Sequence, residues 1–290
     1  MMVRNCRRVT PSWKCVGSLI PVRHPYSTET LVGSRRRRLA CGEPMMQSPP
    51  IAVIPARWAS TRFPGKPLAT LAGRPMVLHV VDACRRAGVF AEVVVATDDA
   101  RIAEVVARAG ARAELTRPDH LSGTDRVAEV AGRLPADGRS VVLNVQGDEP
   151  LVEPAALATL LGAFDEPGVE MATLVRPLEE AERLLPQVVK AVLDVRGDAL
   201  YFSRADLPFA RDGAPVQRWA HLGLYGYRRQ TLARLARLQP MPLERAESLE
   251  QLRALEHGIR IRCVQTEARS LGVDTPEDLA RAEALLAGRR

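Results

Sequence analysis

The feature that most constrains the fold is an alternation, beginning at Ile51, of short apolar runs with segments of helical period. Ile51–Ile54 is the first apolar run, and Pro75 then opens a segment whose apolar residues recur at helical spacing. Strands and helices that alternate through short loops form a mostly parallel sheet with helices on both faces. The alternation predicts an α/β, Rossmann-like domain that binds ligands at the carboxyl ends of its strands. The other strands predicted in this half are Glu92–Thr97, Ala111–Thr116 and Val141–Val145.

Two helix beginnings in this half can be placed from capping residues. Asp98 or Asp99 is expected to cap the helix after the second strand, because an aspartate there accepts hydrogen bonds from free helical amides. Ser122, with Asp125 three residues later, is typical of a capping box. A further helix is therefore expected from Ser122 to about Leu134.

The second half of the chain changes character, because its strand-like runs are separated by irregular segments that contain proline. This pattern predicts a smaller mixed lobe, at about residues 186–240, inserted into or appended to the first sheet. A helix from about Arg245 to His257, a strand from Ile259 to Gln265 and a last helix with Pro276 in its first position are expected to follow. The strand-like runs are Met171–Val175, Val188–Val195 and His221–Tyr227.

The net charge of +7 lies entirely in residues 1–50, which contain nine basic and two acidic side chains. Residues 51–290 contain 32 of each sign and are neutral. A neutral body gives no electrostatic reason to expect a nucleic-acid groove. No apolar run reaches the ~18 residues that a membrane-spanning helix needs, so neither nucleic acid nor a membrane is an expected partner.

Residues 1–50 have no sustained hydrophobic period and end in a segment typical of a linker. They could be a transit peptide, since they are rich in arginine and poor in acids, or a disordered basic arm. The interpretation we favour is that translation begins at Met45 or Met46 and the preceding residues are a gene-start artefact. The body has only Cys84 and Cys263, without CxxC spacing, which agrees with a reducing, cytoplasmic location.

The loop after the first strand, residues 55–67, contains three cations, Arg57, Arg62 and Lys66. Cationic side chains and backbone amides at the end of a first strand suit a polyphosphate. The loop is neither a Walker loop nor a GxGxxG loop. A solvated basic loop without a ligand remains the alternative on composition alone.

The fourth strand leads into an acid-bearing turn, Asn144–Pro150, at the same edge of the predicted sheet. Asp148 in this turn and Asp274, just before the last helix, could together bind Mg²⁺, which proteins usually hold by one or two carboxylates plus substrate phosphates. Taken singly, each aspartate could instead be an ordinary turn or helix-capping residue.

Residues 51–287 resemble the sugar cytidylyltransferases, and among them the enzymes that act on 3-deoxy-manno-octulosonate (Kdo). The resemblance implies a nucleotidyltransferase, GT-A-like fold, with the smaller lobe serving for homodimerisation. It also implies Mg²⁺-dependent transfer of CMP from CTP to the anomeric hydroxyl of Kdo, for lipopolysaccharide biosynthesis. The blocks that carry the resemblance are IPARWASTRFPGKPL, VATDD, TRPDHLSGTDR, VLNVQGDEP, ALYFSRADLPF, HLGLYGYRR, LEQLR and GVDTPEDL.

The resemblance also implies a role for particular residues. The triphosphate would be bound by Arg57, Ser60, Arg62 and Lys66. The rest of the nucleotide would lie near Arg117, Asp119, Ser122 and Gly123. The sugar acid would meet Gln146, Arg204, His221, Tyr225, Glu250 and Gln251. The metal would be held by Asp148 and Asp274, and these two with Arg57 and Lys66 are the expected catalytic residues.

One departure from the family pattern bears on the nucleotide. Pro118 stands where the family usually has alanine, and proline lacks the amide that could contact the base. Alternative substrates are sialate and the 8-amino analogue of Kdo, and a more distant alternative is a glycosyltransferase that binds a nucleotide sugar through Asp98 and Asp99.

Overall fold

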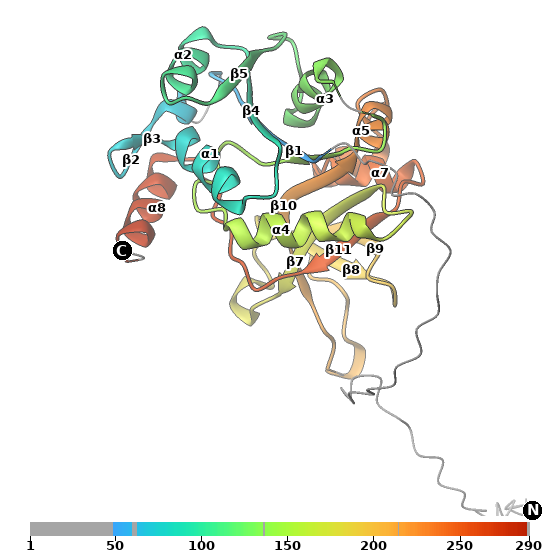
Figure 1. Ribbon diagram of the computed structural model, residues 1–290. Helices are drawn as coiled ribbons and strands as arrows, with labels where there is room; N and C mark the ends of the chain where they lie inside the picture. Colours follow the sequence, from blue (N-terminus) through green and yellow to red (C-terminus); the bar gives the residue numbers. More distant parts are fainter. Residues whose placement is uncertain (1–48, 60–62, 136, 214, 289–290) are drawn as a thin grey trace, which may run out of the picture. The chain divides into compact units, whose positions relative to one another are not determined.

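The computed structural model describes residues 49–288, apart from 60–62, 136 and 214. Its centre is one twisted sheet in which the strands lie in the order β11-β7-β10-β6-β1-β4-β5 (Figure 1). A separate two-stranded hairpin, β2–β3, precedes the first long helix. The strands are β1 Ile51–Ala56, β2 Thr70–Leu71, β3 Arg74–Pro75, β4 Glu92–Thr97, β5 Arg112–Leu115, β6 Val141–Asn144, β7 Met171–Pro177, β8 Lys190–Leu193, β9 Ala199–Ser203, β10 Trp219–Arg228 and β11 Ile261–Gln265.

The helices are distributed along the whole body. The α-helices are α1 Met76–Ala87, α2 Ala100–Arg108, α3 Gly123–Arg133, α4 Pro154–Gly162, α5 Arg229–Leu235, α6 Pro242–Glu247, α7 Gln251–Glu256 and α8 Pro276–Gly288. Four short 3-10 turns are η1 Lys66–Leu68, η2 Ala163–Asp165, η3 Glu180–Glu182 and η4 Arg211–Gly213.

Along the order β11-β7-β10-β6-β1-β4-β5 the sheet is parallel except at β10, and β8 and β9 extend it by antiparallel pairing. β6, β1, β4 and β5 pair in parallel, as do β7 and β11, whereas β10 runs antiparallel to both β6 and β7. β1 in particular has almost no exposed residue, because a strand in the middle of a parallel sheet is covered on both faces. The predicted α/β architecture with a mostly parallel sheet is confirmed.

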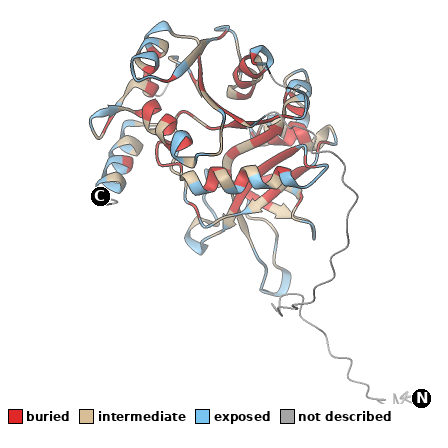
Figure 2. Cartoon of the chain, in the orientation of Figure 1, coloured by how far each residue is buried: buried red, intermediate tan, exposed pale blue. Residues whose placement is uncertain are grey.

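Alternate residues of the strands belong to two separate cores. Ala52 and Ile54 of β1 pack with apolar side chains of α1, α2 and α4 on one face. Ile51 and Val53 pack with those of α3, α5 and α7 on the other face. Figure 2 shows the buried strands between these partly exposed helices. The prediction of helices on both faces is therefore also confirmed.

The predicted smaller lobe contains β8 and β9, which form an antiparallel pair. β8 also pairs with β10 through Ala191 and Lys190, so this part of the chain is hydrogen-bonded to the central sheet. Lys190 is fully buried, and its ammonium donates to the carbonyls of Leu185 and Arg204. A role of this lobe in dimerisation stays a prediction.

The helix predicted from about Arg245 to His257 was wrong as a single element. It is two helices, α6 and α7, separated at Ser248, whose backbone is left-handed with φ 51°. The amide of Leu249 then donates to the carbonyl of Glu244, which closes α6 with a turn wider than a helical one. This break brings Leu249 and Leu252 into the core and turns Glu250 toward a cavity.

Two other predictions concern residues outside the sheet. Within residues 49–288, apart from 60–62, 136 and 214, no helix is long and apolar enough to cross a lipid bilayer. The interpretation of the basic segment falls almost wholly on residues 1–48, which lie outside the described residues.

Candidate functional site

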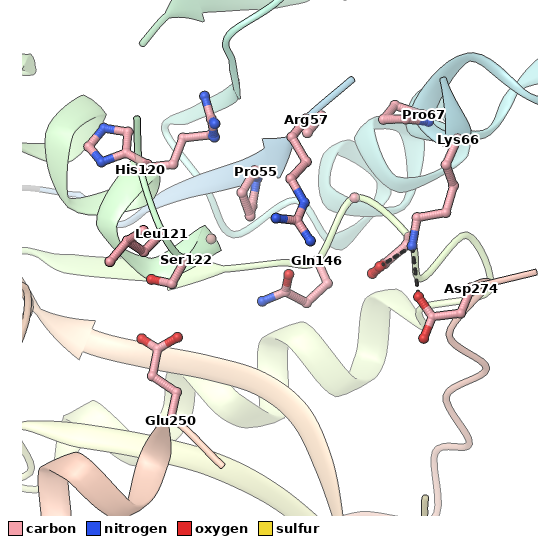
Figure 3. Close-up of a pocket in the computed structure, with 15 residues that line it drawn as sticks. Pro55, Arg57, Lys66, Pro67, His120, Leu121, Ser122, Gln146, Glu250 and Asp274 are labelled. Atoms are coloured by element: carbon pink, nitrogen blue, oxygen red, sulfur yellow. Dashed lines mark hydrogen bonds and ion pairs between the residues drawn. The ribbon is translucent and has the colours of Figure 1, made fainter. Parts of the chain in front are cut away.

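A cavity of about 360 Å³ opens at the carboxyl end of β1, beside the loops that follow β5 and β6. Parallel strands bring their carboxyl ends to one edge of a sheet, which is why loops distant in sequence meet here. Figure 3 shows side chains of opposite charge that converge on the cavity from several elements. The lining residues are Pro55, Ala56, Arg57, Lys66, Pro67, His120, Leu121, Ser122, Gly123, Arg126, Gln146, Gly147, Asp148, Glu250 and Asp274.

Lys66 joins the two predicted metal-binding carboxylates. Its ammonium donates to Asp148 Oδ2 at 2.7 Å and to Asp274 Oδ1 at 3.0 Å (Figure 3). The Lys66 side chain is only 11% exposed, so these bonds are shielded from water on most sides. The structure thus brings together three of the four residues expected to be catalytic, and Arg57 lines the same cavity.

The loop that carries Lys66 is anchored by an aromatic stack. Gly65 has a left-handed backbone, with φ +69°, and lies against the indole ring of Trp58. The guanidinium of Arg101 covers this ring with its carbon 3.4 Å from the ring centre. The amide of Gly65 also donates to the carbonyl of Trp58 at 3.1 Å, which closes the loop. Ser60 and Arg62, predicted within this loop, lie outside the described residues.

The turn that carries Asp148 approaches β1 closely. A side chain at Gly147 would come within 2.7 Å of the Pro55 carbonyl, so only glycine fits there without a shift of the backbone. Gln146 lines the cavity just before this glycine, and its amide donates to Asn144 Oδ1. The predicted position of Gln146 in the site is consistent with this arrangement.

The start of α3 forms another wall of the cavity. Ser122 accepts from the amide of Asp125, and the Asp125 carboxylate accepts from the amide of Ser122, so the predicted capping box is present. Ser122 and Gly123 line the cavity beside this helix N-terminus. An N-terminus with its unpaired amides favours negative ligand groups.

Arg117 and Asp119 do not line this cavity. They lie on the adjacent exposed surface, where Arg117 Nε is 3.6 Å from Asp119 Oδ1. His120 and Leu121, their neighbours in sequence, do reach the cavity. Of the sequence block TRPDHLSGTDR, the structure therefore brings the part from His120 onward to the cavity, and not Arg117 or Asp119.

Sequence reasoning missed Arg126, whose side chain is 3% exposed and lines the cavity. Its guanidinium donates to Asp98 Oδ2 at 2.9 Å and to the hydroxyl of Thr116. It thereby connects the segments that follow β4 and β5. The available signal was a charged residue inside the apolar arc of α3, next to the buried Val127.

Glu250 closes the opposite side of the cavity. It points toward Ser122 and Gln146 in Figure 3, and its Oε1 has no hydrogen-bond partner among the described residues. Burial raises the pKa of Glu250, while a hydrogen bond from Thr124 acts in the other direction. An acceptor of this kind, buried and without a donor, is suited to a ligand that brings hydroxyl groups.

His221, Tyr225 and Tyr227 form a row on β10. The ring centres of His221 and Tyr225 are 5.4 Å apart, and those of Tyr225 and Tyr227 are 6.0 Å apart. Burial lowers the pKa of His221 to about 3, so this ring is neutral at pH 7. Burial also raises the pKa of Tyr225 well above 10. None of the three is among the residues that line the cavity.

Two other predicted sugar-binding residues are engaged in the fold. Arg204 donates to the backbone carbonyls of Pro186, Glu247 and Ser248, so three of its five N–H groups are bound to backbone of the lobe and around the end of α6. Gln251 is buried in the first turn of α7. Neither residue lines the cavity.

Glu149 was not predicted to have a role and is the most perturbed acid of the Asp148 turn. It is buried, and burial raises its pKa to about 7, while a hydrogen bond from Ser270 lowers it. Ser270 Oγ donates to Glu149 Oε2 at 2.6 Å. This contact lies next to the cavity but does not line it.

Comparison with known proteins identifies relatives over most of the body. A model of the cytidylyltransferase family matches residues 51–261. The 3-deoxy-manno-octulosonate cytidylyltransferase of Myxococcus xanthus is 58% identical over 241 residues, which cover 82% of this chain and 97% of that protein. The protein of the same name from Geobacter sulfurreducens is 51% identical over 245 residues, covering 79% of this chain and 96% of the relative.

Solved structures agree with the sequence comparison. The structure of CMP:2-keto-3-deoxy-manno-octonic acid synthetase complexed with CTP is 43% identical, with a TM-score of 0.80, and covers 84% of this chain and 100% of its own. A 4-diphosphocytidyl-2C-methyl-D-erythritol synthase from Anaerococcus prevotii shares only the fold, at 14% identity and a TM-score of 0.55, covering 82% of this chain and 98% of its own.

Proposed function

The chain belongs to the cytidylyltransferase family, and from this premise we propose that it transfers CMP from CTP to the anomeric hydroxyl of Kdo. The hydroxyl oxygen gives up its proton to solvent and bonds to the α-phosphorus, the bond from that phosphorus to the oxygen shared with the β-phosphorus breaks, and pyrophosphate leaves with that oxygen. The observation that carries the proposal is the convergence of Arg57, Lys66, Asp148 and Asp274 on one cavity. The product, CMP-Kdo, would serve lipopolysaccharide biosynthesis.

The carboxylates of Asp148 and Asp274 fit a divalent cation. Both already flank one cation, the Lys66 ammonium, at 2.7 and 3.0 Å. Two carboxylates completed by substrate phosphates are a usual donor set for Mg²⁺. When bound, the metal would stabilise the charge that develops on the phosphate oxygens. We therefore propose that Asp148 and Asp274 hold Mg²⁺ together with CTP.

The triphosphate is proposed to lie along the first loop. Arg57 and Lys66 supply fixed positive charge in a partly enclosed site, where such charge acts more strongly than in water. Ser60 and Arg62 remain proposed contacts from the same loop. Ser122 and Gly123, at the start of α3, are proposed to bind another part of the nucleotide.

Arg117 and Asp119 also remain proposed nucleotide contacts, from the surface beside the cavity. Pro118 between them has no amide to offer to a base. We propose that Arg126 and His120, which do line the cavity, support this nucleotide wall.

The sugar acid is proposed to enter between Gln146 and Glu250. The unpartnered Oε1 of Glu250 would accept from a sugar hydroxyl, and the neutral His221 and Tyr225 would lie behind it. Gln251 remains a proposed contact. Arg204 remains a proposed partner of the Kdo carboxylate, since its three carbonyl bonds leave two N–H groups of the guanidinium for it.

The glycosyltransferase alternative is disfavoured by the state of its acidic pair. Asp99 caps α2 and pairs with Arg101, and this pairing lowers its pKa. Asp98 accepts from Arg126 and from the amide of Trp58. Both carboxylates are therefore engaged in holding the protein together rather than pointing at a ligand.

We also propose a homodimer formed through the smaller lobe. The segment from residue 184 to residue 216 exposes large apolar side chains that a second copy could cover. These side chains are Leu184, Leu185, Val195, Leu200, Phe209 and Val216.

The activity is tested by pyrophosphate release from the full chain with CTP and Mg²⁺. Release should require Kdo as acceptor. Sialate or 8-amino-Kdo in place of Kdo should be a poorer acceptor, and UTP in place of CTP should be a poorer nucleotide substrate. Equal or faster turnover with sialate or with UTP would overturn the assignment. A preference for 8-amino-Kdo would retain the chemistry and change the acceptor.

A further inference from the structure

Glu149 and Ser270 join two segments that are 121 residues apart in sequence. Glu149 directly follows Asp148, and Ser270 precedes Asp274 by four residues. Their hydrogen bond of 2.6 Å therefore connects the two segments that carry the proposed metal ligands. Glu149 itself is only 8% exposed and does not line the cavity.

The segment that carries Asp274 has little structure of its own. Residues 266–274, between β11 and α8, contain no helix or strand. A second bond, from the amide of Val273 to the carbonyl of Asp148 at 2.9 Å, also holds this segment to the turn. Besides these two bonds, Asp274 is held by the packing of Val273, by the bond from its own amide to Asp278 Oδ2 of α8, and by the Lys66 ammonium.

Simple packing does not account for a carboxylate at this position. A buried acid costs free energy unless it is hydrogen-bonded, and an apolar side chain of similar volume would fill the same space without that cost. The role of the Glu149 carboxylate is thus in the bond that it accepts.

We propose that Glu149 is a positioning residue, whose hydrogen bond to Ser270 holds Asp274 at the separation from Asp148 that a shared divalent cation needs. This inference rests on the proposed function, since it assumes that the two aspartates bind one metal with CTP. It assigns to Glu149 no contact with substrate. Its effect is expected on metal affinity more than on Kdo or CTP affinity.

The test uses the full chain with Glu149→Ala, Glu149→Gln and Ser270→Ala. Loss of the bond should raise the Mg²⁺ concentration for half-maximal activity about tenfold in Glu149→Ala and Ser270→Ala, as expected for a lost buried hydrogen bond. Glutamine keeps an acceptor for the serine, so Glu149→Gln should stay within about threefold of wild type. The double variant Glu149→Ala/Ser270→Ala should be no worse than either single variant.

A control is Ser203→Ala, which removes another serine–glutamate bond of 2.6 Å, to Glu247, and a bond from the Ala205 amide, both away from the cavity. Ser203→Ala should lower the melting temperature by an amount similar to that in Ser270→Ala, and it should leave the Mg²⁺ requirement unchanged. Equal Mg²⁺ requirements in wild type, Glu149→Ala and Ser270→Ala would overturn the proposal. If Glu149→Ala fails to fold, Ser270→Ala alone decides.

A second measurement separates this proposal from the proposed function. Binding of Mn²⁺ in the presence of CTP, followed by electron paramagnetic resonance, needs no turnover of Kdo. Weaker Mn²⁺ binding in Ser270→Ala than in Ser203→Ala supports the positioning role even if Kdo is not the acceptor. Unchanged Mn²⁺ binding, or none in wild type, rejects it.

Discussion

At the scale of single residues, the Lys66 ammonium holds two carboxylates that would otherwise repel each other. Asp148 and Asp274 are 34% and 46% exposed, so water weakens but does not remove this repulsion. Lysine has three donors on a flexible stem, and it can move from carboxylates to phosphate oxygens without a change in the backbone. The same side chain can therefore serve both before and after the nucleotide binds.

Asp148→Asn and Asp274→Asn should each lower kcat by a hundredfold or more while the protein stays folded. Asparagine keeps the volume of aspartate and can occupy a turn, but it is a poorer ligand for Mg²⁺. Steady-state kinetics at saturating Mg²⁺ and circular dichroism provide the measurement. Asp137→Asn is the control, because Asp137 also occupies a turn, where it accepts from the amides of Arg139 and Ser140. Near-normal rates in both site variants would reject the metal role.

Arg57→Ala and Lys66→Ala should each reduce kcat/KM for CTP about a hundredfold, since a cation in a shielded site can contribute ~3 kcal/mol as charge develops. Lys66 is already shielded, whereas Arg57 is exposed and would be shielded by the bound triphosphate. An exposed surface cation contributes ~1 kcal/mol or less, which corresponds to about fivefold. Arg86→Ala, at the exposed end of α1, is the matched surface control. If Arg57→Ala and Lys66→Ala behave like Arg86→Ala, the triphosphate binds elsewhere.

His221 should make the protein sensitive to acid. The unfolded chain binds a proton at this residue below pH 6.5, whereas the folded chain does so only near pH 3. Its contribution to stability is therefore complete above pH 6.5 and is lost as the pH falls toward 3. Between pH 7 and pH 5 this loss is up to about 2 kcal/mol. Urea unfolding at the two pH values should show a smaller loss in His221→Gln than in wild type, and equal losses would contradict the assignment.

At the scale of elements, local chemistry predicted some boundaries and failed at others. β4 and the capping box of α3 depend on residues adjacent in sequence, and both were predicted from them. β9 and α5 were not predicted. For β9 the reason is that the strand forms through its pairing with β8, which is not visible in the local sequence. The break at Ser248 was also missed, since serine rarely adopts a left-handed backbone and only the packing of Leu249 and Leu252 explains it.

The residues of the candidate site could likewise be predicted only in part. Residues delivered by strand ends, such as Lys66 and Asp148, could be placed from the order of the strands. Arg126 and Glu149 could not, because their importance lies in partners at Asp98 and Ser270 that no spacing in the sequence reveals.

The first loop depends on Gly65 for two separable reasons, its positive φ and the nearby Trp58 ring. Gly65→Ala should raise the KM for CTP tenfold or more, because the new methyl group would meet the ring at 3.0 Å and displace the segment that carries Lys66. Gly73→Ala is the control, since Gly73 has φ +80° but nothing within 4 Å. Both variants should lose about 1 kcal/mol of stability from the strained backbone. An unchanged KM in Gly65→Ala would show that the stack does not position the loop.

At the scale of the whole molecule, the smaller lobe is where assembly should occur. Leu200 and Phe209 are 61% and 85% exposed, and a second copy would remove both from water. Light scattering should give a dimer for wild type and a monomer for Leu200→Asp and Phe209→Asp. Leu285→Asp, a change at a leucine that is 50% exposed on α8, should remain dimeric. A monomeric wild type, or dimers in both lobe variants, would disprove the interface.

The reversed strand β10, between β7 and β6, has an evolutionary consequence. Proposed nucleotide contacts come from residues 57–126, whereas most proposed acceptor contacts come from residues 204–251, on or around β10, and the proposed metal ligands Asp148 and Asp274 lie outside both stretches. Substitutions that retune the acceptor can accumulate in the later stretch while the earlier one stays intact. Recombination that replaced the codons between Asp148 and Asp274 and left both proposed metal ligands in place would join an existing nucleotide-binding part to a new acceptor part, a route by which one ancestral scaffold can acquire different acceptors.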